Sequence, residues 1–263
     1  MATTLDLAPP APALPRGIDL PYSDGEPLES LWHRAAGDLL LASIHWHWRE
    51  RTDFFAGANQ FFYFDPKTAR NTNFRGPDFY VVTGVSHEPI RRSWVAWEEG
   101  GRVPNVVVEL LSESTAEEDR VEKKRVYLEQ LDVREYYCYD PDGRVLEGWR
   151  KGKRKPTAIK PAADGRLRSE ELDLSLGAWD GVYLTYHDTW LRLFDAAGEL
   201  VPTPAEAADA LARAEAARAR AEAARAQAAT ARARAEATRA DSAEAEVAKL
   251  RAELARLRSA PKS

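Results

Sequence analysis

Two carboxylates in apolar surroundings are the residues of this chain best suited to chemistry. Asp78 follows Pro77 at the start of one apolar run, and Glu109 lies inside another, with valines before it and leucines after it. An ionised carboxylate in such surroundings is costly unless it is paired or bound to a metal ion. If the two runs form neighbouring strands, the carboxylates converge on a position that can hold Mg²⁺ through oxygen ligands. With a lysine nearby to orient a water molecule or to stabilise the pentavalent state, such a site would hydrolyse a phosphate ester.

Structural roles compete with this interpretation. Asp78 could cap the start of its strand, and Glu109 could be the buried partner of an arginine. Cys138 lies among aromatic residues and is expected in the core, because no base for a nucleophilic thiol can be placed. His45 and His47 are two positions apart, so on a helix they do not share a face and are not expected to form a metal pair.

The first half of the chain predicts the elements that carry the two carboxylates. An amphipathic helix is expected over residues 30–51, followed by strand-like runs at 60–64, 79–85, 93–97 and 105–111. The last run is nearly continuous in apolar residues, as in a strand that is covered on both faces.

A second helix is expected from Thr115 to Leu131, with Thr115 as its N-cap and Glu118 at the capping-box position. It crosses from the strand at 105–111 to another at 134–139, which a DPDG turn at 140–143 joins to a strand at 144–149. Further strands are expected at Val182–Tyr186 and Trp190–Phe194. This order of elements indicates an α/β fold with a mixed sheet.

The C-terminal part of the chain predicts one long helix. From Ala205 to about Ser259 there is no glycine or proline, and alanine, arginine and glutamate dominate. About 54 helical residues would extend for about 80 Å. Four apolar residues have the spacing of a coiled-coil seam, over about two heptads: Val247, Leu250, Leu254 and Leu257. The segment at 205–258 therefore favours a homo-oligomer through a coiled coil, and a lone salt-bridged helix is the alternative, since so short a seam buries little area.

The charge distribution does not favour a general DNA-binding protein. The formal net charge is −5. Residues 206–258 contain 11 Lys and Arg against 9 Asp and Glu, and Lys262 adds one more positive charge, so residues 1–205 carry −5 − 3 = −8. So acidic a body lacks the broad basic surface expected of such a protein. The basic run at 150–155 could contact nucleic acid, but short charge runs are more often solvated turns.

The cellular setting follows from what the sequence lacks. With Cys138 as its single cysteine, the chain cannot form an internal disulfide, and a reducing, cytoplasmic compartment is expected. No run of about 20 apolar residues predicts a membrane span. Residues 1–20 lack the pattern of a secretory signal and are rich in proline and alanine, so we expect a flexible leader.

Several segments together resemble a known family. These are RGPD at 75–78, NVVVELLSEST at 105–115, DRVEKKRVY at 119–127 and VREYYCYDP at 133–141. The set is similar to the Uma-type putative restriction endonucleases of the PD-(D/E)XK nuclease superfamily, which are common in bacterial genomes. The resemblance covers about residues 20–200, and the segments 190–195 and 202–204 before an alanine-rich tail are typical of one branch.

The resemblance implies a fold, an activity and a set of ligands. The fold would be a restriction-endonuclease-like mixed central sheet flanked by helices, over residues 21–201, with a helical tail at 202–263. Asp78 and Glu109 would hold Mg²⁺ or Mn²⁺, with the backbone carbonyl of Leu110 as a third ligand. The activity implied is endonucleolytic hydrolysis of DNA.

The chain departs from the superfamily pattern at its lysine. The superfamily places this lysine two residues after the glutamate, where this chain has Leu111. The family's Asp-x-x-x-Lys-x-x-x-Tyr pattern instead matches Asp119, Lys123 and Tyr127, which share one helical face. Lys123 is therefore the expected catalytic lysine, with Lys124 as its reserve.

Other roles stay open near this lysine. Asp119 is either a site residue or a charge of the first helical turn, and Lys123 could be an ordinary solvated lysine. Glu26, Glu29 and His33 could approach the site from the N-terminal helix. If no lysine reaches the carboxylates, the domain would be a catalytically silent binding or assembly module.

Overall fold

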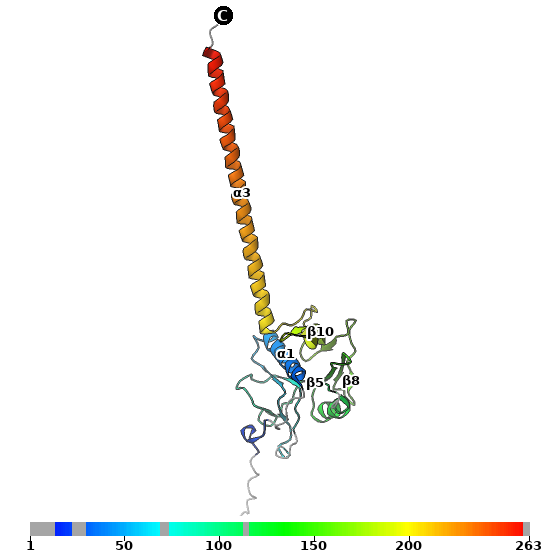
Figure 1. Ribbon diagram of the computed structural model, residues 1–263. Coiled ribbons are helices and arrows are strands. Elements are labelled where there is room, and N and C mark those ends of the chain that lie inside the picture. Colours follow the sequence, from blue (N-terminus) through cyan, green and yellow to red (C-terminus); the bar gives the residue numbers. More distant parts are fainter. Residues whose placement is uncertain (1–13, 23–29, 69–73, 113–115, 260–263) are drawn as a thin grey trace, which may run out of the picture. The chain divides into compact units, whose positions relative to one another are not determined.

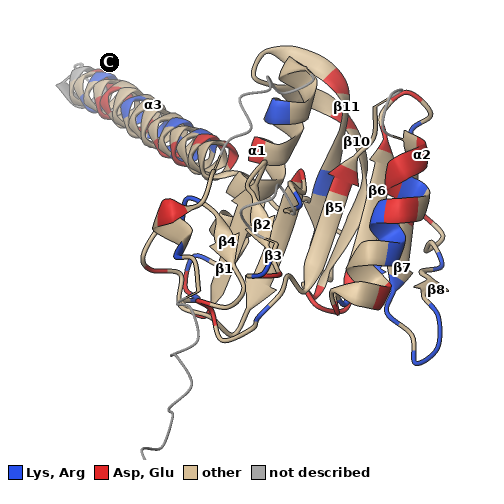
Figure 2. Ribbon diagram, turned by 90° about the horizontal axis from the view of Figure 1, so that it is seen from below, with Lys and Arg blue, Asp and Glu red and all other residues tan. Residues whose placement is uncertain are grey.

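Figure 1 shows the fold of the chain, and Figure 2 labels the strands of its mixed central sheet, which are six in number and lie in the order β1-β3-β5-β6-β7-β8. Strands β5 and β6 run parallel, and every other neighbouring pair runs antiparallel. The computed structural model describes residues 14–22, 30–68, 74–112 and 116–259. The strands of this sheet are β1 (Phe54–Ala58), β3 (Phe79–Thr83), β5 (Val106–Leu110), β6 (Glu135–Asp140), β7 (Val145–Arg150) and β8 (Thr157–Ala158).

The parallel pair β5–β6 is joined by the predicted crossover helix. Ala116–Glu118 (α2) is α-helical, whereas Asp119–Lys123 (η3) and Val126–Gln130 (η4) are π-helical. The wider winding shows in the hydrogen bond from the Leu131 N–H to the Val126 carbonyl, five residues earlier, at 3.0 Å. The helix is confirmed, while its π-helical winding was not predicted. The predicted cap Thr115 lies outside the described residues.

Helix α1 (Leu31–His47) begins after a serine whose side chain accepts a hydrogen bond from a backbone N–H of the first turn. The Ser30 hydroxyl accepts a hydrogen bond from the His33 N–H at 3.2 Å, as an N-cap does. The helix ends at His47 rather than at the predicted residue 51, and Trp48 follows it with a non-helical backbone. One side of α1 is buried, in keeping with the predicted amphipathic stripe.

Two smaller sheets complete the body. β2 (Phe62–Tyr63) and β4 (Trp94–Val95) pair in parallel, so the predicted strands at 60–64 and 93–97 are reduced to two residues each. β9 (Leu167–Ser169), β10 (Leu174–Tyr183) and β11 (Tyr186–Phe194) form an antiparallel sheet.

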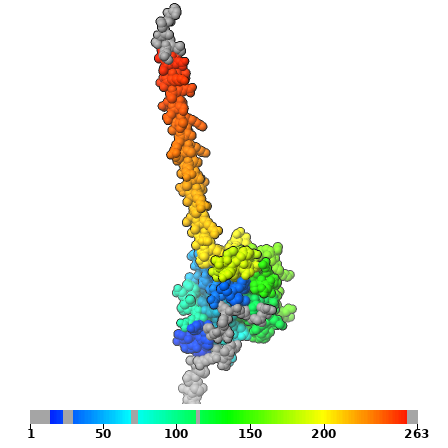
Figure 3. All heavy atoms as spheres, in the orientation of Figure 1, coloured from blue at the N-terminus to red at the C-terminus, as the bar shows by residue number. Residues whose placement is uncertain are grey.

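The predicted strand at Val182–Tyr186 is wrong, because the chain reverses inside it. Leu184 and Thr185 have φ of 47° and 72° and form the tip of the β10–β11 hairpin. Their side chains carry no turn signature, so the apolar pattern concealed the reversal. Figure 3 shows this hairpin, in yellow-green, against α1, in blue, and the Trp32 and Trp190 rings stack at 5.9 Å between centroids.

The central sheet is buried on both faces. On one face, Val106, Val108 and Leu110 of β5 pack in a cluster with α1 and the β10–β11 hairpin. On the other face, Val107 and Leu111 pack with residues of η4 and β6. The expected α/β fold is confirmed. Glu109 interrupts the second apolar face.

The C-terminal segment is one continuous helix, α3 (Pro204–Ser259). The chain divides into two compact units, residues 1–204 and residues 205–263. Within the first unit, residues that the sequence assigns to the leader make contacts: the Trp97 indole donates to the Pro15 carbonyl at 2.9 Å, and Leu20 is buried. Among the described residues, no helix is both long and apolar enough to cross a membrane.

Candidate active site

The register of β3 and β5, continued by one position, sets Asp78 opposite Glu109. Phe79 pairs with Val108 in the antiparallel β3–β5 ladder, so the next position outward pairs Asp78 with Glu109. Directly opposite residues project from the same face of a sheet, with their Cβ atoms about 5 Å apart. This face carries the crossover helix, because the neighbours on the same face, Tyr80 and Val107, pack in the cluster that contains Leu128 of that helix.

The crossover helix brings a lysine to this pair of carboxylates. The Lys123 ammonium lies 3.3 Å from Glu109 Oε2 and 2.6 Å from Asp119 Oδ1. The side chains of Glu109 and Asp119 are 1% and 2% exposed, and that of Lys123 is 23% exposed. Lys123 is therefore not a solvated helix lysine, and Asp119 is a buried partner of Lys123 rather than a solvated charge of the first turn. Figure 2 shows acidic and basic residues along this helix.

Asp78 is fixed by the backbone of the strand beside it. Its Oδ2 accepts a hydrogen bond from the Leu110 N–H at 2.7 Å. The carbonyl oxygen of Leu110 accepts from His33 Nε2 at 3.0 Å, and His33 Nδ1 lies 2.9 Å from the Ser30 hydroxyl. Because a carbonyl only accepts, Nε2 carries a proton. The His33 ring therefore connects the N-cap residue of α1, Ser30, to β5, the strand that carries Glu109.

Burial dominates the electrostatics of the cluster. It raises the pKa of Glu109 well above its usual range, and the nearby Lys123 ammonium opposes part of this rise. The pKa of Asp78 is also raised by burial, against the hydrogen bond from the Leu110 N–H. Burial lowers the pKa of Lys123, but Glu109 and Asp119 outweigh it, so this pKa is raised and the ammonium stays charged.

Two buried side chains lie beside Glu109: Tyr127 of the crossover helix and Cys138 of β6. Glu109 Oε1 and the Tyr127 hydroxyl are buried, and neither has a hydrogen-bond partner among the described residues. Burial raises the pKa of Tyr127, and the Glu109 carboxylate raises it further. Cys138 lies opposite Glu109 in the β5–β6 ladder, and burial raises the pKa of its thiol, which therefore stays protonated as expected of a core cysteine.

The donor set suits a hard cation with few protein ligands. In the part of the chain that the structure describes, no group of three or more His, Cys, Asp or Glu side chains is arranged to hold a metal ion. Mg²⁺ in phosphoryl-transfer sites takes one or two carboxylates and completes its shell with water and phosphate oxygens. Asp78 and Glu109 meet this requirement, and the unpartnered buried Oε1 of Glu109 is an open ligand atom.

Other predicted site residues lie elsewhere. The Lys124 ammonium lies over the Trp149 ring, 4.2 Å from its centroid, so it does not serve as a reserve for Lys123. Leu111, at the superfamily's lysine position, is buried in the apolar cluster. Glu26 and Glu29 fall outside the described residues. Sequence reasoning left His33 as one of several possibilities, and its only signal was its place three residues after the capping serine.

Two further sequence features do not join the cluster. Within the basic run at 150–155, Arg150 pairs with Glu135 at 2.9 Å and with Glu170 at 3.0 Å, and Lys151 pairs with Asp132. The run therefore begins with ion-paired residues and continues into the exposed turn between β7 and β8. Burial lowers the pKa of His45, and the nearby His87 lowers it further.

Comparison with known proteins assigns the family. The model of the Uma2 family, described as putative restriction endonuclease, matches residues 5–185. Among solved structures, a putative nuclease belonging to DUF820 from Anabaena variabilis is 14% identical and has a TM-score of 0.39, over 57% of this chain and 81% of that chain. No curated protein matches the chain. Since the family model spans well over half of its length, the chain belongs to the Uma2 family of putative restriction endonucleases.

Proposed function

We propose that the chain is a metal-dependent endonuclease that hydrolyses phosphodiester bonds of DNA. The observation that carries the proposal is the buried cluster in which Lys123 reaches Glu109 directly opposite the position of Asp78. Membership of a family of putative restriction endonucleases supports the same class of reaction.

The charges of the cluster favour a divalent cation. Asp78, Glu109 and Asp119 supply three carboxylates, and Lys123 supplies one ammonium. If all are ionised, their sum is −3 + 1 = −2, which is costly in a buried cluster unless a cation compensates it. Mg²⁺ or Mn²⁺ held by Asp78, Glu109 and the Leu110 carbonyl would neutralise this charge, activate the attacking water and stabilise the negative charge of the phosphate in the transition state.

The chain's own residues then have distinct roles. Asp78 and Glu109 would hold the metal ion, which would supply the positive charge that binds the reacting phosphate. Lys123 orients the attacking water and stabilises charge that develops on the phosphate oxygens. Asp119 helps to keep Lys123 protonated, because its carboxylate is the nearer of the two to the ammonium. The same contact holds the ammonium beside Glu109. His33 holds the Leu110 carbonyl in place.

A second candidate is a nuclease-like binding module without activity. Its support is the charge of −8 over residues 1–205 and the leucine at the superfamily's lysine position. An acidic surface repels DNA except where a basic group faces it. Assays of cleavage separate the two candidates.

The test compares wild type with Glu109→Gln and Asp78→Asn. Supercoiled plasmid and single-stranded DNA are incubated with full-length protein in Mg²⁺, in Mn²⁺ and in EDTA. We expect cleavage that depends on the metal ion and falls by at least about 100-fold in both variants, a rise of about 2.7 kcal/mol in the activation barrier. Equal cleavage by wild type and Glu109→Gln would overturn the assignment, and no cleavage by wild type under any condition would favour the binding module.

Glu122→Gln is the matched control. Glu122 lies in the same helix, is exposed and pairs with Arg125 at 2.8 Å. Its substitution removes a carboxylate without touching the cluster, so activity should stay unchanged. Glu109→Gln is expected to fold, because glutamine has the shape of the neutral glutamic acid that burial favours.

A further inference from the structure

Arg75 has a fixed backbone at the entrance to β3. Its N–H donates to the Phe62 carbonyl at 3.0 Å, and its carbonyl accepts from the Phe62 N–H at 2.7 Å. This two-way bridge ties the segment to β2, three residues before Asp78. The backbone of Arg75 is therefore held in place close to the start of the strand that follows Asp78.

The Arg75 guanidinium has donors that the described residues leave unused. Its Nη1 donates to the Phe74 carbonyl at 3.1 Å, and the group lies 5.9 Å from the centre of the Phe64 ring. Its Nε is buried and has no hydrogen-bond partner among the residues that the structure describes. In the same part of the chain, no carboxylate forms an ion pair with it. A half-buried guanidinium with unused N–H donors is costly unless an anion accepts hydrogen bonds from it and balances its charge.

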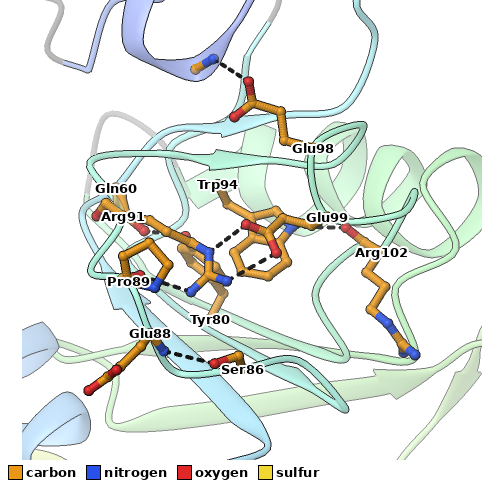
Figure 4. Close-up of polar contacts among 11 residues, drawn as sticks. Gln60, Tyr80, Ser86, Glu88, Pro89, Arg91, Trp94, Glu98, Glu99 and Arg102 are labelled. Carbon is orange, nitrogen blue, oxygen red and sulfur yellow. Dashed lines mark hydrogen bonds and ion pairs between the residues drawn. The ribbon is translucent and has the colours of Figure 1, made fainter.

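Arg91 is an arginine of the same domain whose guanidinium is hydrogen-bonded and ion-paired within the protein. Its guanidinium donates to both oxygens of Glu99, at 2.5 and 3.0 Å, and to the Pro89 carbonyl at 3.2 Å (Figure 4). It also lies over the Phe55 and Trp94 rings. Arg75 is also partly buried, but no described carboxylate pairs with it, so ion pairing within the described residues does not explain its burial.

The surroundings of Arg75 include the helix that supplies Lys123. Its positive charge opposes the rise in the pKa of Tyr127 and contributes to the lowered pKa of Glu122, whose larger cause is Arg125. Glu109 acts on the same Tyr127 hydroxyl with the opposite sign. The geometry agrees, because the guanidinium lies 5.9 Å from the centre of the Phe64 ring, and Phe64 packs against the apolar cluster that contains Tyr127 and Leu128 of this helix.

A planar guanidinium binds phosphate oxygens with two parallel hydrogen bonds, which suits a nucleic-acid strand better than a point charge would. We infer that Arg75 binds a phosphate group of the nucleic-acid strand whose phosphodiester lies at Asp78 and Glu109. This inference rests on the proposed function and names a positioning residue. Arg75 transfers no proton, and it fixes the strand relative to the carboxylates.

Binding of labelled DNA oligonucleotides, followed by fluorescence anisotropy in Ca²⁺ over a range of salt concentrations, tests this role. The full-length chains compared are wild type, Arg75→Met, Arg75→Lys and Arg92→Ala. Methionine keeps the apolar stem beside Phe64 and removes the charge. We expect Arg75→Met to weaken binding by about 10-fold, in the range of a charged hydrogen bond, and to lower the slope of log K against log salt by about 1.

The other two variants separate a phosphate contact from a structural role. Arg75→Lys should restore the salt slope and part of the affinity, because lysine keeps the charge but not the paired donors. Arg92 is exposed and lies over the Tyr22 ring, so Arg92→Ala should bind as wild type does. A wild-type affinity and salt slope in Arg75→Met would overturn the inference, as would a wild type that does not bind DNA.

The binding assay needs no cleavage, so the two proposals can fail separately. If wild type binds DNA through Arg75 but cleaves none in Mg²⁺ or Mn²⁺, the proposed activity fails and the Arg75 contact stands. If wild type cleaves DNA and Arg75→Met keeps both its affinity and its KM, the Arg75 contact fails and the activity stands. A melting curve for each variant confirms that it is folded.

Discussion

At the scale of single residues, the ammonium of Lys123 is shared unequally between two buried carboxylates. It lies 2.6 Å from Asp119 Oδ1 and 3.3 Å from Glu109 Oε2. A lysine on the strand, two residues after Glu109, would not have this second carboxylate from its own helix. The helical position therefore adds a residue that orients the lysine, at the cost of burying one more negative charge.

We expect Lys123→Met to lose both activity and stability. Cleavage should fall by about 100-fold or more, since a group that stabilises charge in the transition state is removed. The free energy of unfolding should fall by about 3 kcal/mol, because two buried carboxylates lose their cation. Adding Glu109→Gln to Lys123→Met should recover part of the stability and none of the activity. Plasmid cleavage and urea denaturation measure the two effects, and full activity in Lys123→Met would contradict the role given to this lysine.

The stability of the metal-free protein should fall as the pH rises. Burial raises the pKa of Glu109 and of Asp78. A carboxyl whose pKa is higher in the folded than in the unfolded protein binds its proton more tightly when folded, so its contribution to stability is present at acid pH and is lost as the pH rises through the folded pKa. The decline should begin at about pH 4, where these groups titrate in the unfolded chain.

Urea denaturation in EDTA between about pH 4.5 and pH 8 measures this decline. Lys123 is protonated in both states over this range and adds no slope. Glu109→Gln should show a shallower fall than wild type, because one of the two groups no longer titrates. Identical slopes in the two proteins would show that Glu109 does not carry a raised pKa.

The sequence indicated which residues could do chemistry but not all of their partners. Asp78 and Glu109 stand out because each is a charge in an apolar strand, and the register that sets them opposite each other is visible only once β3 pairs with β5. Asp119 looks like a charge of the first helical turn, and its burial depends on the packing of the helix. Arg75 carries no signal of its own beyond its place in the RGPD run.

At the scale of elements, the predictions held where periodicity is strong. The helix at α1, the apolar strand β5 and the β6–β7 hairpin follow from amphipathic spacing, a run of valines and a DPDG turn. β1 was missed because its sequence, FFAGA, contains small residues of low strand propensity. The π-helical turns depend on how the crossover helix packs, which its sequence does not reveal.

Gly37 allows α1 to approach the strand that carries Asp78. A Cβ added at Gly37 would lie 3.2 Å from the Asp78 carbonyl oxygen and 3.3 Å from Asn59 Nδ2. Gly37→Ala should gain up to about 1 kcal/mol of helix propensity and lose a similar amount to crowding, so its stability should change little. Activity should fall by about 10-fold, because a small displacement of a reacting group has a large effect on rate.

The comparison variant for Gly37→Ala is Asp38→Ala, which changes an exposed position of the same helix. Cleavage rates and melting temperatures of both variants decide the outcome. If Gly37→Ala keeps the wild-type rate, α1 does not fix the position of Asp78.

At the scale of the whole molecule, the two units differ in kind. Residues 1–204 enclose apolar clusters around a central sheet, whereas every described side chain of α3 from Leu211 to Ala255 is exposed. Val247, Leu250 and Leu254 are 47%, 59% and 52% exposed. Leu257 lies outside the residues whose side chains are described. A helix that leaves such residues in water gains stability by pairing with another helix.

Sedimentation equilibrium of the full-length chain tests this pairing. We expect an oligomer, and we expect Leu250→Glu combined with Leu254→Glu to return it to the monomer mass, because charges at seam positions oppose association. Leu211→Glu, at an exposed position of the same helix outside the seam, should leave the mass unchanged. An unchanged mass in the seam variant would rule out association through these leucines.

The placement of Lys123 in the crossover helix also makes the cluster depend on a strand that carries none of its charged residues. Asp78 and Glu109 are brought together where β3 pairs with β5, whereas the helix returns to the sheet at β6, which pairs with β5 in parallel. A molecule that ends before β6 is therefore expected to lack the support that places the Lys123 ammonium at the carboxylates. If the chain cuts DNA as proposed, such a truncated molecule should be inactive even though it contains every charged residue of the cluster.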